Sequence, residues 1–507
     1  MAQLKSQMKL PLPVCPAFLH HRNGQQNQAA RADRAVLRKM IAQHLGGVTP
    51  AQGSVDTYAR EGVPLGATIS GLEVSPTDSE SIRLWVVRHA VDGAGREVPA
   101  LVLSFGSVRS EPSPSTLWRF AKAVHFASEA GLPAQKYTIF CLSEEWAKGE
   151  LGNAPLVEVD VTEDIRDRLP LVPEWLEKEA AILADPDPDK VRNSRECAMC
   201  GLNQVSIGRN TCPALDVGDP PTTAVLPGTA GASVRKKLGI MLLKDVPDSA
   251  FSKSSRAEQL TRVRDAHVKQ ASVVDVTALA NAIAALDVMT GDNPLCFLDF
   301  ETVAFNVPRW TGCAAGVQVP FQWSLHRQHR GELIHREFIS LNGDDPTRAC
   351  AEALCAAAAM ELGPVVGYNT SFEKGVLLWL ADRYPDLGAY LRNIAERLWD
   401  LYPVVERTYY HPAMAGSYSL KAVAPAVLGF DPYAGLGIAD GEAAMDAFVF
   451  SSSYHEYETT TIATAKSLTE YCKTDTLCTV LVLEKFRAWL TPYEASIASL
   501  ESEELVL

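Results

Sequence analysis

Residues 294–302 read Pro-Leu-Cys-Phe-Leu-Asp-Phe-Glu-Thr, an apolar run that leads directly into two carboxylates. Residues i and i+2 of a β-strand point to the same face of a sheet, so a strand here places Asp299 and Glu301 side by side. Two negative charges at that spacing repel each other unless a cation lies between them. Oxygen ligands of this kind suit Mg²⁺ or Mn²⁺. The stretch therefore predicts a metal site at the end of a buried strand.

A second segment carries polar side chains of the same kind. Residues 365–367, Val-Val-Gly, predict a short strand. Asn369, Phe372 and Glu373 follow this strand at the start of a predicted helix.

A third segment is the helix predicted over residues 468–483, which carries Tyr471 and Asp475 four residues apart. Side chains at this spacing lie one above the other on the same helix face. A phenol above a carboxylate can position a water molecule against a metal-bound phosphate. Each pattern alone is also typical of an exposed strand edge, a helix cap or an ordinary helix surface. Their occurrence in this order, within about one domain length, favours a single site.

In this order the three segments resemble the three motifs of the DEDD exonuclease superfamily, in its tyrosine-type branch. Members of that family have a ribonuclease-H-like fold and remove nucleotides from 3′ ends with two metal ions. The resemblance implies catalytic roles for Asp299, Glu301, Glu373, Tyr471 and Asp475. It implies that two Mg²⁺ or Mn²⁺ ions are held by Asp299, Glu301, Glu373 and Asp475. It implies substrate contacts for Thr302, Asn369, Phe372 and Lys421.

The implied reaction is metal-assisted hydrolysis of a phosphodiester, with two cations about 3.5–4 Å apart. Asp299 would bridge both ions. Glu301 and Asp475 would complete one coordination sphere, and Glu373 would support the other. Tyr471 would orient the attacking water. Because phosphoryl transfer asks the protein mainly for positioning and charge, a site built almost entirely of carboxylates suits it.

The second motif departs from the family pattern, because Glu373 stands where that motif normally ends in Asp. Glutamate is a competent ligand for Mg²⁺ but reaches one methylene further. Asp400, in the segment Leu-Trp-Asp-Leu of residues 398–401, is an alternative ligand at that corner.

A more specific resemblance surrounds these motifs and covers residues 235–490. It is to a bacterial family catalogued only as a domain of unknown function, whose members carry an exonuclease-like domain behind a RecB-like nuclease region. The segments that carry it are residues 409–412, 416–421, 431–433 and 438–441. Lys421 within them is either a phosphate contact or an ordinary surface lysine.

Four of the eleven cysteines form a pattern typical of metal ligation, with Cys197-Ala-Met-Cys200 followed by Cys212 and preceded by Cys15. One early cysteine and a late cluster of three resemble the iron–sulfur staple of RecB-like nucleases. That resemblance implies a [4Fe-4S] cluster. Zinc is the alternative, and free buried cysteines remain a third explanation.

The region between these cysteines predicts the strand and helix order of a RecB-like domain. Strands are predicted over residues 83–87, 98–103 and 137–141, and a helix over residues 115–130. The active form of that family needs Glu-x-Lys on the central strand, but residues 103–107 read Leu-Ser-Phe-Gly-Ser. Without a carboxylate and a lysine to hold metal and activate water, we predict that this domain is catalytically inactive.

Composition bounds the remaining choices. The 507 residues are 47% hydrophobic, enough for about two to four domains with proper cores. No run of about 18 apolar residues occurs, and the N-terminus lacks the apolar core of a signal peptide. We therefore expect a cytoplasmic protein with no membrane partner. The net charge of −14 argues against non-specific coating of nucleic acid but is compatible with a local basic channel.

The predicted fold class is α/β, with a ribonuclease-H-like mixed sheet behind a restriction-endonuclease-like α/β domain. The predicted organisation is a degenerate RecB-like domain with the cysteine cluster (1–215), a linker (216–234), a helical connector (235–290), the exonuclease domain (291–495) and a tail (496–507). The predicted function is a metal-dependent 3′→5′ exonuclease, with DNA favoured over RNA. Two alternatives stay open: an inactive nucleic-acid-binding or sensing module, and an endonuclease acting on structured DNA.

Overall fold

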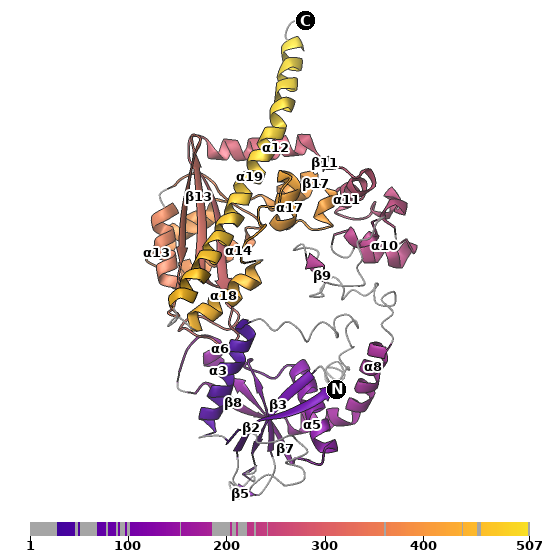
Figure 1. The fold of residues 1–507 in the computed structure, drawn as a ribbon, viewed down its shortest axis with the longest axis vertical. Helices are drawn as coiled ribbons and strands as arrows, with labels where there is room; N and C mark the ends of the chain where they lie inside the picture. Colours follow the sequence, from indigo (N-terminus) through magenta and orange to yellow (C-terminus); the bar gives the residue numbers. More distant parts are fainter. Residues whose placement is uncertain are drawn as a thin grey trace. The chain divides into compact units, whose positions relative to one another are not determined.

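The computed structural model describes residues 28–45, 49–50, 68–77, 80–87, 90–91, 97–98, 102–152, 154–184, 203–204, 209–210, 221–227, 230–240, 242–358, 361–438, 440–453 and 458–504. Contacts divide the chain into two compact units. Unit 1 comprises Met1–Pro186 and Ala304–Val317, and unit 2 comprises Asp187–Val303 and Gln318–Leu507. Both units combine helices with β-sheet (Figure 1), so the predicted α/β class is confirmed.

Unit 1 is built on a six-stranded sheet with the order β1-β2-β3-β6-β7-β8. β6 pairs in parallel with β7 and antiparallel with β3. The strands of the sheet are β1 (Thr49–Pro50), β2 (Thr68–Thr77), β3 (Glu80–Val87), β6 (Val102–Ser107), β7 (Lys136–Leu142) and β8 (Leu156–Asp160). A separate pair of two-residue strands is formed by β4 (Ala90–Val91) and β5 (Glu97–Val98).

The main helix of unit 1 is α5 (Pro114–Glu129), which confirms the helix predicted over residues 115–130. Ser113 caps its N-terminus by accepting a hydrogen bond from a backbone N–H of the first turn. Its apolar face buries Phe120 in a core shared with Ile139 of β7. The other helical elements are α3 (Gln28–His44), α6 (Glu144–Ala147), α7 (Thr162–Arg168), the 3₁₀ turn η1 (Leu169–Leu171) and α8 (Val172–Ala184).

The strand predicted over residues 98–103 overlaps β6 at Val102 and Leu103, and β6 continues to Ser107. The segment 103–107, where the Glu-x-Lys motif is expected, therefore lies within β6, an inner strand of the sheet. This strand offers neither a carboxylate nor a lysine.

Unit 1 also contains residues 304–317, a segment that connects two strands of unit 2 along the chain. Asp33 of α3 is almost fully buried and accepts hydrogen bonds from the backbone N–H of Asn306 at 2.8 Å and of Val307 at 3.2 Å. The Arg309 guanidinium pairs with the same carboxylate at 3.1 Å. Residues 304–317 are therefore held to α3 by a buried, hydrogen-bonded ion pair, an arrangement that the sequence pattern does not predict.

Unit 2 is built on a five-stranded mixed sheet with the order β14-β13-β12-β15-β16. β13 pairs antiparallel with both β12 and β14, whereas β15 pairs in parallel with both β12 and β16. The strands are β12 (Leu295–Val303), β13 (Val319–His329), β14 (Glu332–Ile339), β15 (Val365–Gly367) and β16 (Leu398–Asp400).

The alternation of side chains along β12 assigns each face of this sheet to different helices. Cys296, Leu298 and Phe300 point into a core formed with α13 (Thr347–Ala358), α14 (Ser371–Arg383) and α15 (Gly388–Glu396). Leu295 and Phe297 point the other way, into a core formed with α12 (Val276–Thr290), α16 (Tyr402–Thr408), α17 (Leu420–Leu428) and α19 (Glu458–Glu504). Asp299 and Glu301 continue that second row, so they lie on the face toward α19.

The described residues between 221 and 290 contribute side chains to this same second core. Val263 of α11 (Ala257–Lys269) and Leu279 of α12 belong to it, together with Phe486 of α19. The other elements of unit 2 are β9 (Asn203–Gln204), β10 (Arg209–Asn210), η4 (Thr223–Val225), α10 (Ala230–Leu238), η5 (Leu243–Asp245), η6 (Asp248–Ala250), β11 (Val273–Val274), β17 (Tyr409–Tyr410), η7 (Pro412–Met414) and α18 (Gly441–Ser453).

Two predicted boundaries differ from the structure. α10 begins at Ala230, inside the linker predicted over residues 216–234. α19 continues to Glu504, so most of the tail predicted over residues 496–507 is helical. Among the described helices, none combines the length and the apolar character that crossing a bilayer requires.

Candidate metal centre

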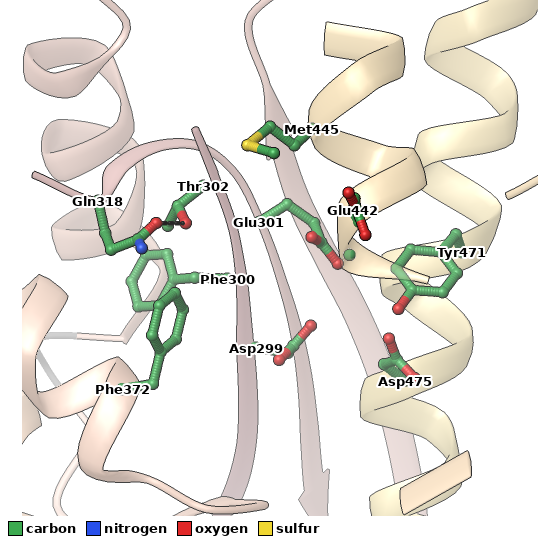
Figure 2. A pocket seen from close by; sticks show the side chains of 11 residues that line it. Asp299, Phe300, Glu301, Thr302, Gln318, Phe372, Glu442, Met445, Tyr471 and Asp475 are labelled. Atoms are coloured by element: carbon green, nitrogen blue, oxygen red, sulfur yellow. Dashed lines mark hydrogen bonds between the residues drawn. The ribbon is translucent and has the colours of Figure 1, made fainter. Parts of the chain in front are cut away.

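The register of β12 brings Asp299 and Glu301 to one face of the sheet. Asp299 lies opposite Ser324 of β13, and Glu301 lies opposite Gln322, immediately before an irregularity in the strand pairing. Figure 2 shows both carboxylates pointing toward α19. The predicted strand and its paired carboxylates are therefore present in the structure.

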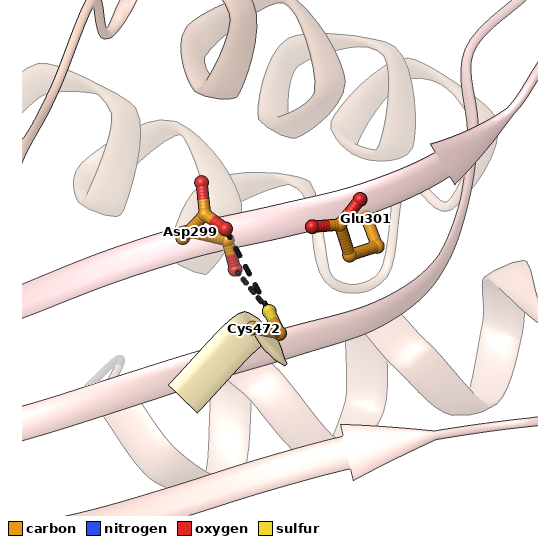
Figure 3. Close-up of side chains that lie close together, drawn as sticks. All are labelled: Asp299, Glu301 and Cys472. Atoms are coloured by element: carbon orange, nitrogen blue, oxygen red, sulfur yellow. Dashed lines mark hydrogen bonds between the residues drawn. The ribbon is translucent and has the colours of Figure 1, made fainter. Parts of the chain in front are cut away.

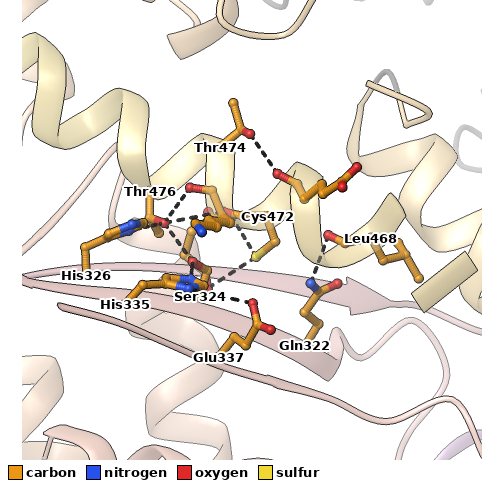
Figure 4. A network of polar contacts seen from close by, with 12 residues as sticks. Gln322, Ser324, His326, His335, Glu337, Leu468, Cys472, Thr474 and Thr476 are labelled. Carbon is orange, nitrogen blue, oxygen red and sulfur yellow. Dashed lines mark hydrogen bonds and ion pairs between the residues drawn. The ribbon is translucent and has the colours of Figure 1, made fainter. Parts of the chain in front are cut away.

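A polar network holds α19 against this face of the sheet (Figure 4). The Gln322 amide donates to the carbonyl oxygen of Leu468 at 3.0 Å. The Thr476 hydroxyl lies 2.7 Å from the Ser324 hydroxyl and 2.8 Å from Nδ1 of His326. Buried hydrogen bonds of this kind fix the position of a helix along a sheet. They set the height at which α19 presents its own side chains to Asp299 and Glu301.

The residues of α19 that meet the carboxylates are Tyr471, Cys472 and Asp475. Tyr471 and Asp475 line a cavity of about 340 Å³, near the lower end of roughly 300–1,000 Å³ for small-ligand sites. The full lining is Asp299, Phe300, Glu301, Thr302, Gln318, Phe372, Gly441, Glu442, Met445, Tyr471 and Asp475. The first and third predicted motifs, from β12 and α19, thus share one cavity.

Cys472 is an additional member of the site that sequence reasoning missed. Its thiol lies 3.7 Å from Oδ2 of Asp299 and 4.0 Å from the carbonyl oxygen of Asp299. The ligand atoms of Asp299, Glu301 and Cys472 all lie within 4.8 Å of one another (Figure 3). Burial and the nearby carboxylates raise the pKa of this thiol well above its usual value, so it donates toward Asp299. The sequence could have indicated this, because Cys472 precedes Asp475 by three residues and so shares its face of the helix.

Glu373 is buried, with 4% of its surface exposed, near the N-terminus of α14. Its Oε2 atom has no hydrogen-bond partner within the part of the chain that the structure describes. Its charge acts on Asp299 and Glu301, raising the pKa of both. An unpaired buried carboxylate oxygen is costly unless a cation or a proton satisfies it. Glu373 is therefore coupled by charge to the carboxylates of β12, although it is not among the residues that line the cavity.

Asp400, the alternative ligand suggested by the sequence, accepts backbone hydrogen bonds with both of its carboxylate oxygens. Its Oδ1 atom accepts hydrogen bonds from the backbone N–H of Asn369 at 2.8 Å and of Tyr402 at 3.0 Å. Its Oδ2 atom accepts one from Thr370 at 3.1 Å. These bonds hold the turn between β15 and α14, in which Asn369 has a left-handed φ of 67°. Asp400 therefore orients the helix that carries Glu373.

Burial raises the pKa of all four predicted metal-binding carboxyls. For Asp299, burial acts first and the charge of Asp475 second, and together they hold the pKa well above its usual range. Burial and the same charge raise the pKa of Glu301 to about 8. Burial and the charge of Asp400 raise that of Glu373 to about 8. Burial also raises the pKa of Asp475. These shifts favour the protonated forms in the metal-free site, and a bound cation would favour the ionised forms.

Lys421 and Tyr433 complete the polar contacts around α19. The Lys421 ammonium donates to the phenol oxygen of Tyr471 at 2.6 Å. The Tyr433 hydroxyl donates to Oδ1 of Asp475 at 2.7 Å. Sequence analysis assigned Lys421 to substrate and gave Tyr433 no role.

The predicted substrate contacts divide into two groups. Thr302 and Phe372 line the cavity, and the Thr302 hydroxyl donates to Gln318 at 2.7 Å. Asn369 is exposed and is not among the lining residues. Gln318, Glu442 and Met445 line the cavity without having been predicted, because nothing in their local sequence marks them.

The predicted cysteine cluster lies outside the described residues. This applies to Cys15, Cys197, Cys200 and Cys212.

Comparison with protein families gives one match. A family model described as "Domain of unknown function (DUF2779)" matches residues 296–419. No curated protein and no solved structure matches the chain. The matched segment includes Asp299, Glu301 and Glu373 but ends before Tyr471 and Asp475. It therefore spans only part of the cavity.

Proposed function

We propose that unit 2 is a metal-dependent nuclease that removes nucleotides from 3′ ends, of the tyrosine-type DEDD class on a ribonuclease-H-like fold. The observation that carries the proposal is the cavity lined by Asp299, Glu301 and Asp475. Burial raises the pKa of these three carboxyls and of Glu373, whose charge acts on those of β12. Carboxylates with raised pKa in a cavity are candidates for metal binding or catalysis.

The chemistry of the donor set fits Mg²⁺ or Mn²⁺. Asp299, Glu301, Glu373 and Asp475 would hold the ions, because hard divalent cations prefer carboxylate oxygens. When bound, two such ions supply the charge that activates a water molecule and stabilises the leaving oxygen. The unpartnered Oε2 atom of Glu373 supports its inclusion despite the departure from Asp.

Tyr471 would orient the attacking water. Its phenol oxygen accepts a hydrogen bond from Lys421, and Asp475 lies one helical turn away on the same face of α19. A phenol oxygen that accepts one bond and donates another has one acceptor position left. Tyr471 can therefore accept a hydrogen bond from water beside the carboxylates.

The exposed ring of Phe372 and the side chain of Met445 add apolar surface to the cavity lining. Apolar surface of this kind suits a base or sugar, while the carboxylates suit a metal-bound phosphate. DNA is the favoured polymer because the sequence of unit 1 resembles RecB-like domains. Unit 1 would then bind or guide nucleic acid without cleaving it, since β6 lacks the Glu-x-Lys pair.

The test is digestion of single-stranded DNA and RNA, labelled at either end, with Mn²⁺ and with EDTA. Asp299→Asn keeps the shape of the side chain and removes its charge, and Glu332→Gln on the exposed end of β14 is the matched control. Stepwise shortening from the 3′ end, lost in Asp299→Asn and kept in Glu332→Gln, is the expected result.

Two other outcomes would replace the proposal. Binding of nucleic acid with no cleavage under any divalent metal would make unit 2 an inactive binding module. Cleavage of circular single-stranded DNA would make it an endonuclease.

A further inference from the structure

We propose that residues 420–433 supply two positioning residues, Lys421 and Tyr433, which hold Tyr471 and Asp475 in their working geometry. This inference rests on the proposed function, because it assigns roles around the same site. Both residues lie beyond the segment that the family model matches, which ends at residue 419.

Lys421 determines that the Tyr471 hydroxyl oxygen acts as a hydrogen-bond acceptor on the side facing α17. It lies in the first turn of α17, with its ammonium 2.6 Å from the Tyr471 oxygen and 4.5 Å from the centre of its ring. A lysine ammonium only donates hydrogen bonds, so the Tyr471 oxygen must accept. The Tyr471 proton must then point away from Lys421, and Asp475 lies one helical turn along the same face of α19 and lines the same cavity. Lys421 thus fixes the direction in which the Tyr471 oxygen can accept a hydrogen bond from water.

Tyr433 orients the second residue of the pair, Asp475, by a hydrogen bond to its carboxylate. Its hydroxyl donates to Oδ1 of Asp475 at 2.7 Å. The loop that carries Tyr433 is held by its own turn, in which the backbone N–H of Tyr433 donates to Oδ1 of Asp431 at 2.9 Å. Tyr433 therefore fixes one oxygen of the Asp475 carboxylate, one helical turn from Tyr471.

The two positioning residues also lie close to each other. The Lys421 ammonium is 5.7 Å from the centre of the Tyr433 ring, so the cation and both phenols form one cluster. Partners that surround a ligand in this way commonly set its orientation and basicity, and their loss costs about 10–100-fold in metal affinity or activity.

This assignment differs from the sequence-based one, in which Lys421 contacts a substrate phosphate. A phosphate contact contributes to substrate binding, so its loss raises KM. A residue that positions Tyr471 contributes to the chemical step, so its loss lowers kcat and leaves KM nearly unchanged. The two roles can therefore be separated in one kinetic experiment.

The first arm of the test measures Mn²⁺ affinity of the full chain by titration calorimetry. Tyr433→Phe removes one hydroxyl and should weaken Mn²⁺ binding by about 10–100-fold. Tyr409→Phe is the matched control, because it removes a buried hydroxyl that donates to the Ala426 carbonyl oxygen instead. Wild-type affinity in Tyr433→Phe would overturn the role of Tyr433. This arm needs no catalysis, so it still decides if the protein binds Mn²⁺ without cleaving nucleic acid.

The second arm compares Lys421→Met with Lys473→Met. Lys473 is an exposed lysine on α19, the helix that also carries Tyr471. We expect Lys421→Met to lower kcat at least tenfold with KM within twofold of wild type, and Lys473→Met to change neither. A raised KM with unchanged kcat would overturn the positioning role of Lys421. A readout independent of activity is the ¹⁹F signal of 3-fluorotyrosine placed at position 471, which Lys421→Met should shift and Lys473→Met should not. An unshifted signal would overturn the contact itself.

The outcomes separate the two proposals. A wild-type protein that binds no Mn²⁺ removes both the nuclease and the positioning roles. A wild-type protein that cleaves, with Tyr433→Phe and Lys421→Met behaving as wild type, leaves the nuclease and removes only the inference.

Discussion

Replacing Glu373 by Gln should stabilise the metal-free protein, and the gain should grow with pH. Burial and the charge of Asp400 raise the pKa of Glu373 from an ordinary 4.5 to about 8. The folded state therefore holds a proton that the unfolded state releases between these two values. Stability must fall as pH rises through that range, because the unfolded state binds fewer protons. The amide of Gln mimics the protonated acid and removes this loss.

The size of the effect follows from the two pKa values. At 1.36 kcal/mol per pH unit, the interval from 4.5 to about 8 sets an upper limit of about 5 kcal/mol at pH 8. At pH 7 the same reasoning gives about 3 kcal/mol. Hydration and relaxation of the site will reduce both figures, so we expect a gain of at least about 1 kcal/mol at pH 8. At pH 5 the gain should nearly vanish.

The assay is urea unfolding of wild type and Glu373→Gln in EDTA at pH 5 and pH 8, with Glu332→Gln on β14 as an exposed control. Excess Mn²⁺ should narrow the difference at pH 8, because it stabilises the wild type more than Glu373→Gln. A gain at pH 5 equal to that at pH 8 would refute the reasoning, since it would assign the effect to packing. So would a Glu373→Gln protein less stable than wild type at pH 8.

Three further predictions concern the same site. Asp299→Asn should lower Mn²⁺-dependent cleavage by at least 100-fold while leaving the circular dichroism spectrum unchanged, as measured on end-labelled DNA; retained cleavage would remove Asp299 from the site. Asp400→Ala should destabilise unit 2 by about 2–4 kcal/mol, because three backbone N–H groups lose a charged acceptor, and urea unfolding beside Asp382→Asn checks this. The Cys472 thiol lies within 4.8 Å of the ligand atoms of Asp299 and Glu301, so it could contact a bound metal. Cys472→Ser should keep Mn²⁺ binding within about threefold and weaken Cd²⁺ or Zn²⁺ binding more strongly, because thiolates favour softer metals. Equal losses in calorimetry for all metals would contradict this metal contact.

The sequence by itself determined the local geometry of the candidate site. Alternation along a strand has a period of two, so the order Asp-Phe-Glu in residues 299–301 was enough to place both carboxylates on one face. Helical spacing was enough to place Tyr471 and Asp475 on one side of α19. These inferences depend on backbone geometry within a few residues, and that geometry is the same in any fold that contains the strand and the helix.

Only the tertiary structure decided which groups meet. The contact of Cys472 with Asp299 joins residues 173 positions apart, and those of Lys421 with Tyr471 and Tyr433 with Asp475 span 50 and 42. No local period encodes separations of this length. They follow from the packing of α17 and α19 onto the second face of the sheet, which is driven by apolar residues far from the carboxylates. The structural role of Asp400 could not be predicted for a different reason. Its partners are backbone N–H groups, which almost every residue provides, so no residue type in the sequence marks them.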